Sequence, residues 1–93
     1  MRRKINPSPL TKRMLSELGV NIKLARRRRK LSIKIVAQRV GVAINTVVSV
    51  ERGDPGVSIG AVVNVLHSLG LAEDISKVAK DDVVGRKIQD SKL

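Results

Sequence analysis

The sequence predicts an all-α domain of five helices with a helix–turn–helix at its centre. Along most of the 93-residue chain the apolar residues recur at spacings of three and four, which is the period of an amphipathic helix. Strands are disfavoured although the chain has fourteen valines, because these do not alternate strictly with polar residues. Two short helical patterns end at glycines, at positions 41 and 53, and glycine readily takes the left-handed conformation that closes a helix.

The N-terminal third is expected to form a basic arm followed by a long helix. Residues 1–8 are predicted to be a flexible arm, and Ser8 followed by Pro9 is typical of a helix start. Helical spacing then continues to Lys30 through Met14, Leu18, Ile22 and Ala25. Gly19 interrupts this pattern, so the sequence allows either one helix of about 20 residues or a break near the glycine.

Residues 32–53 predict two short helices joined by a tight turn. Ser32 is a natural N-cap for the first helix, and Gly41 can redirect the chain at its end. The buried positions are expected to be Val36, Ala37 and Val40 in the first helix and Val47 and Val50 in the second. This leaves Ile44, Asn45, Thr46 and Ser49 facing outward. A compact helix–turn–helix is the shape that enters a DNA major groove, although helical hairpins also occur in proteins that never touch DNA.

The C-terminal third predicts one apolar helix and a weaker tail. After the turn at residues 53–56, a wide apolar stripe is formed by Ile59, Val62, Val63, Leu66 and Leu69. A short helix is expected from about Ala72 to Lys80, and Asp81 and Asp82 are candidate caps for a last turn with Val84 and Ile88. The expected division is an arm at 1–8, a domain at 9–80 with its helix–turn–helix at 32–53, and a short helix or tail at 81–93.

The basic charge is concentrated near the N-terminus. The chain has a net charge of +11, and residues 1–30 carry eleven Lys and Arg against one Glu, a net of +10. Such a concentration favours a polyanionic partner over a merely solvated face. The chain has no Phe, Tyr or Trp on which an unstacked base or a membrane interface could be anchored. Duplex DNA therefore fits better than single-stranded nucleic acid or an anionic membrane.

Enzymatic and metal chemistry have little support in the sequence. There is no cysteine, which removes disulfides and thiolate sites and is consistent with a cytosolic protein. His67 is the lone histidine, and the carboxylates of the tail are better explained as helix-start charges than as metal ligands. No signal peptide or transmembrane span is expected. The sequence predicts no enzyme, no metal and no cofactor.

The central motifs resemble a known family. The matching segments are ARRRRKLS, VAQRVGVAINTVVSVERG and SIGAVVNVLHSLGL, and over residues 18–71 they are similar to the Xre-type helix–turn–helix family of Cro and phage repressors. The ERGDP turn and the closing DDVVGRKIQ look most like HipB-type antitoxins. The resemblance implies a lambda-repressor-like fold and a prokaryotic, cytoplasmic, nucleoid-associated homodimer bound to a double-stranded DNA operator. It also implies a HipA-like serine/threonine kinase toxin as partner and repression of the protein's own operon.

The resemblance also assigns roles to individual residues. Arg26 matches the helix-1 arginine that pairs with the glutamate ending the recognition helix, here Glu51, whereas the alternative makes Arg26 one of four solvated arginines. The candidate phosphate contacts are Ser32, Lys34, Gln38, Arg26 and Arg27, and the arm residues Arg2, Arg3 and Lys4 could enter a minor groove. The candidate base-reading residues are Ala43, Ile44, Asn45, Thr46 and Ser49. Among these, Asn45 can form a bidentate pair with adenine, and Ile44 can only touch a thymine methyl group.

Three apolar residues depart from the family pattern. Ile33 stands where a glutamine that binds phosphate is common, Ile44 occupies a base-reading position, and Val48 lies where a polar side chain is usual. They predict weak or A·T-leaning specificity, or reliance on a partner. If all three are exposed, they instead form an apolar patch for protein contact, and the chain is an interaction module that mainly inhibits a kinase. A stand-alone phage-type repressor is a further alternative.

The tail is expected either to mediate dimerisation or to close the monomer core. A single recognition helix reads few bases, so a dimer that meets two half-sites is expected. The apolar residues available for the dimer surface are Leu71, Ile75, Val78, Val83, Val84 and Ile88.

Overall fold

The computed structural model describes residues 6–91 and contains six α-helices and no strand in that range. The helices are α1 (Pro9–Arg28), α2 (Ile33–Val40), α3 (Ile44–Arg52), α4 (Ile59–Ser68), α5 (Glu73–Ser76) and α6 (Val83–Ser91). The predicted all-α class is confirmed. The predicted number of five helices is wrong, because the residues after Asp82 form a helix of nine residues and not a single turn.

Helix α1 is continuous through Gly19. It starts as predicted, with Pro9 in the first turn and the Ser8 hydroxyl accepting a hydrogen bond from the Thr11 N–H at 3.2 Å. Gly19 is buried against α3, and a Cβ atom at this position would collide with the carbonyl group of Glu51. The glycine therefore marks a close approach of two helices and not a break in α1.

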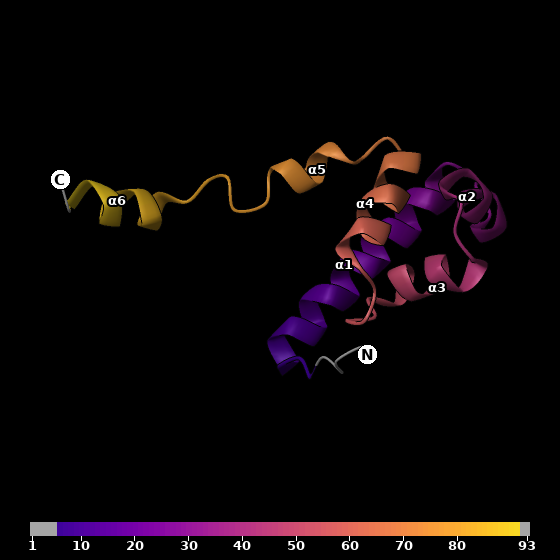
Figure 1. Ribbon diagram of the computed structural model, residues 1–93, viewed down its shortest axis with the longest axis horizontal. Helices are drawn as coiled ribbons and strands as arrows, with labels where there is room; N and C mark the ends of the chain where they lie inside the picture. The colour runs from indigo at the N-terminus through magenta and orange to yellow at the C-terminus, as the bar shows by residue number, and fades with distance from the viewer. Residues whose placement is uncertain (1–5, 92–93) are drawn as a thin grey trace.

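Helices α2 and α3 form the predicted helix–turn–helix. The Ser32 hydroxyl caps α2 by accepting from the Ile35 N–H at 3.1 Å, and Gly41 ends it in the left-handed region with φ of 80°. Gly53 ends α3 in the same way, with φ of 69°. The chain turns through 111° between the two helices, within the range of about 90–120° found in helix–turn–helix units. Figure 1 shows this pair beside the C-terminal half of α1.

The core lies where the first four helices meet. Its buried side chains are Ile22 and Ala25 of α1, Val36 and Ala37 of α2, Val47 and Val50 of α3, and Val65 and Leu66 of α4 with Leu69 just beyond. The buried residues predicted for α2 and α3 are largely confirmed, and Val40 is half-buried beside them.

The burial predicted from helical spacing is wrong for several apolar residues. Met14 is 43% exposed and Leu18 is 37% exposed, so neither belongs to the core, although Gly19 of the same helix is buried against α3. Ile59 begins α4 and is 72% exposed, so it does not belong to the apolar stripe on that helix. Val65 takes a place in the core that the predicted stripe did not include.

The tail departs from the predicted outline. Helix α5 has four residues, shorter than the expected span from Ala72 to Lys80, and Ala79 leaves the right-handed region with φ of 61°. Asp82 then caps α6, since its carboxylate accepts a hydrogen bond from the Gly85 N–H at 2.9 Å. Figure 1 shows α6 standing away from the rest of the molecule at the end of an extended segment. Among the described residues no single helix is long and apolar enough to span a membrane, and only the bent α2–α3 pair reaches the required length and composition.

Candidate nucleic-acid interface

A buried ion pair joins the end of α1 to the end of α3. The Arg26 guanidinium donates through Nε to Glu51 Oε2 at 2.6 Å and through Nη2 to Oε1 at 3.0 Å, and Nη1 donates to the Leu31 carbonyl at 2.8 Å. Both charged residues are only 9% exposed. The pair implied by the family resemblance is therefore present, and the alternative of a solvated Arg26 is wrong. Because the partners lie 25 positions apart, the pair sets where α3 lies relative to α1.

Burial separates Arg26 from the other basic residues at this junction. Arg27, Arg28 and Lys30 are exposed, and Arg29 is exposed while donating to the Ala25 carbonyl at 2.9 Å. The guanidinium of Arg26 is committed to Glu51 and Leu31, so its predicted phosphate contact stays a prediction. The exposed neighbour Arg27 is the more accessible of the two to a backbone phosphate.

The first turn of α3 forms an exposed edge. Ala43, Ile44 and Asn45 are exposed, and Ile44 retains 49% of its accessible surface. No side chain caps α3, so the N–H groups of its first turn have no side-chain acceptor. Such groups, together with the helix dipole, attract anions. Thr46 and Ser49 are half-buried and lie closer to the core than the outward position predicted for them.

The start of α2 supplies the polar residues beside that edge. Lys34 and Gln38 are exposed and, being four residues apart, lie on one side of the helix. The Ser32 oxygen already accepts a backbone hydrogen bond, but its hydroxyl proton remains available to a phosphate oxygen. The predicted phosphate contacts on α2 are thus all at the surface. The arm residues Arg2, Arg3 and Lys4 lie outside the described residues.

The apolar patch expected from Ile33, Ile44 and Val48 does not form as predicted. Ile33 is half-buried and packs against the core, and Val48 is half-buried as well. Spacing explains Ile33, which precedes the buried Val36 and Ala37 by three and four residues and so shares their side of α2. Ile35 on α2 is exposed, and no feature of the sequence singled it out.

The described part of the chain offers few side chains for a metal site. His67 lies on the exposed side of α4, and residues 6–91 contain no group of three or more His, Asp or Glu side chains placed to hold a metal ion. A scan of the sequence against protein-family models finds no match, and a search of curated proteins finds none either. The geometry of the helix–turn–helix therefore carries the functional argument.

Proposed function

We propose that the protein binds double-stranded DNA through its helix–turn–helix, with the N-terminal edge of α3 in the major groove. The observation that carries the proposal is the joint arrangement of the α2–α3 turn of 111°, the exposed first turn of α3 and the buried Arg26–Glu51 pair that holds α3 in place. The exposed cations at the α1–α2 junction lie next to the capped start of α2, where phosphate contacts would position the domain.

Within that class, we propose a lambda-repressor-like fold and a homodimeric repressor that serves as the antitoxin of a HipA-like kinase and represses its own operon. The family resemblance supports this narrower reading. A stand-alone phage-type repressor differs only in having no kinase partner. The exposed Ile44 favours one second candidate, a module that mainly contacts a kinase, since a large apolar side chain lies in the first turn of α3, on the edge proposed to face DNA.

Sequence readout in this proposal rests mainly on Asn45. Its amide can pair with the N6 and N7 edge of adenine, while Ile44 packs on a thymine methyl group. Ala43 is too small for more than an apolar contact, and Thr46 and Ser49 are half-buried, which leaves less of their surface available to a base edge. The expected specificity is therefore modest and leans towards A·T pairs.

The test is the affinity of the purified chain for its own upstream duplex and for a scrambled duplex across a salt series. We expect a preference for the native duplex that persists as salt rises, because base contacts do not depend on counterion release. Asn45→Ala should lower the native-duplex affinity by about 1–3 kcal/mol, or roughly 5- to 150-fold, and remove the preference. Asn64→Ala is the matched control, since Asn64 is an exposed asparagine on α4. Equal affinities that fall together with salt would contradict sequence reading.

A phosphate contact has a different signature. Lys34→Ala should weaken binding to both duplexes alike and reduce the slope of log affinity against log salt by about 1. An unchanged slope would remove Lys34 from the interface. The antitoxin assignment is tested separately by producing the chain together with a HipA-like kinase of the same genome. Restored growth is expected, and continued growth arrest with the two proteins failing to associate would leave the stand-alone repressor.

A further inference from the structure

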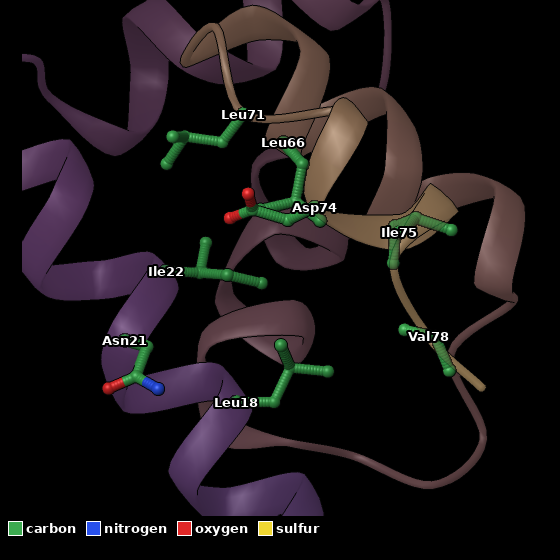
Figure 2. Close-up of a pocket in the computed structure, with 8 residues that line it drawn as sticks. All are labelled: Leu18, Asn21, Ile22, Leu66, Leu71, Asp74, Ile75 and Val78. Atoms are coloured by element: carbon green, nitrogen blue, oxygen red, sulfur yellow. The ribbon is translucent and has the colours of Figure 1, made fainter. Parts of the chain in front are cut away.

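An apolar groove lies on the side of the molecule away from the helix–turn–helix. It has a volume of about 190 Å³ and runs between α1, the end of α4 and α5. The lining residues are Leu18, Asn21, Ile22, Leu66, Leu71, Asp74, Ile75 and Val78. Figure 2 shows Leu18 and Ile22 of α1 on one side and Ile75 and Val78 on the other. The exposed Met14 and Leu10 extend this apolar edge along α1, at four-residue steps from Leu18.

Helix α6 carries an apolar edge that the chain itself does not cover. Val83, Val84 and Ile88 each keep more than half of their surface exposed. Val84 and Ile88 are four residues apart and therefore neighbours on the helix surface. The helix stands clear of the first four helices in Figure 1. The groove and the α6 edge are both apolar, and the first is concave whereas the second is convex.

A helix of this length needs a surface to pack on. Isolated helices shorter than about 12–15 residues are marginal in water, and α6 has nine residues and includes Gly85. Its Asp82 cap contributes on the order of 1 kcal/mol, which does not offset the cost of nucleation. Docking of its apolar edge would supply the missing stabilisation.

Charge favours α6 as the occupant of the groove. Asp74 is the charged residue of the lining, and its contact with Lys77 is long, 3.7 Å, and exposed. Lys87 lies beside the apolar edge of α6, three residues after Val84. A contact between two copies of α1 would instead bring together two strongly basic helices, whereas residues 71–93 carry five basic and five acidic side chains.

We propose that α6 of one copy docks in the α1–α4–α5 groove of a second copy, and that the exchange is reciprocal. This inference deepens the homodimer of the proposed function and rests on it in that respect. Two-fold exchange covers the groove and the α6 edge on both copies, and such reciprocal contacts give a closed dimer. Each copy contributes the apolar edge of α6 and the groove, with Met14 and Leu10 extending the groove along α1.

The first test is sedimentation of the full chain without DNA, so that its outcome is independent of DNA binding. The wild-type chain should sediment as a dimer. Ile88→Asp should raise the dimer dissociation constant roughly 100-fold or more, because each dimer contains the altered contact twice. The thermal unfolding of the monomer should not change, since the core holds no residue of α6. Ile59→Asp is the control, since Ile59 is also an exposed isoleucine and does not line the groove. A wild-type monomer, or an Ile88→Asp dimer of unchanged affinity, would overturn the proposal.

The second test uses the absence of cysteine in the chain. Asn21→Cys marks the groove and Ser91→Cys marks α6 on the side of Val84 and Ile88. Mixing the two single variants under mild oxidation should give a disulfide-linked heterodimer. Ser16→Cys replaces Asn21→Cys in the control, since Ser16 is exposed about 140° around α1 from Asn21. Equal linkage from position 16 would overturn the proposal. A chain that carries both Asn21→Cys and Ser91→Cys gives a further check. A disulfide within a single monomer of this chain would also overturn the proposal, because it would place α6 in the groove of its own copy.

Discussion

The buried Arg26–Glu51 pair should dominate the response of the fold to single substitutions. Glu51→Ala removes the two carboxylate acceptors of the Arg26 guanidinium and leaves a cation that is 9% exposed with one remaining partner, the Leu31 carbonyl. Hydrogen bonds to charged groups are worth about 1.5–3 kcal/mol each, and breaking a buried pair from one side typically costs about 3–5 kcal/mol. A domain of this size has a total unfolding free energy on the order of 5–14 kcal/mol.

Glu51→Ala should therefore remove a large part of the free energy of unfolding. We expect the free energy of unfolding to fall by about 3–5 kcal/mol, and the Tm by roughly 15–30 °C. Urea denaturation followed by circular dichroism measures the change directly. Glu17→Ala is the matched control, because Glu17 is an exposed glutamate on α1 and should change stability by less than about 0.5 kcal/mol.

A double substitution separates the pair's net contribution from the penalty of leaving one charge alone. Arg26→Leu combined with Glu51→Leu places two apolar side chains where the ion pair was, and such replacements are often close to neutral. The double variant should be more stable than Glu51→Ala by at least about 2 kcal/mol. If Glu51→Ala costs no more than Glu17→Ala, the reasoning from burial is refuted.

Two further predictions concern the backbone. Gly19→Ala should destabilise the fold by about 2 kcal/mol or more because a Cβ atom would meet the Glu51 carbonyl, whereas Gly60→Ala, whose nearest neighbour lies 3.9 Å away, should stabilise α4 by about 0.5–1 kcal/mol. A destabilised Gly60→Ala together with a tolerated Gly19→Ala would contradict the packing. Lys30→Gly should stabilise the protein by about 1 kcal/mol, because Lys30 has φ of 55°, and Lys30→Ala, which removes the charge and keeps the strain, should not. Equal effects of the two Lys30 variants in urea denaturation would attribute the change to charge.

The local features of the fold followed from short stretches of sequence. Ser8 and Ser32 cap their helices because a serine oxygen reaches the N–H three residues later, and Gly41 and Gly53 end theirs because glycine adopts positive φ without strain. These interactions need no distant partner. They explain why the central helix–turn–helix and the start of α1 were predicted with the right boundaries.

Only the tertiary structure decided which of the apolar and charged residues are buried. Ile59 and Leu18 continue helical patterns yet lie outside the core, Ile59 at the first residue of α4 and Leu18 on the wall of the α1–α4–α5 groove. Arg26 is one of four consecutive arginines, and it differs from the others through a glutamate 25 positions away that no local spacing indicates. The candidate DNA edge on α3 was predicted as a set of residue types, whereas its division into exposed Asn45 and half-buried Ser49 depends on how α3 packs. Helix caps and turns are thus encoded within a few residues, and burial is a property of the assembled helices.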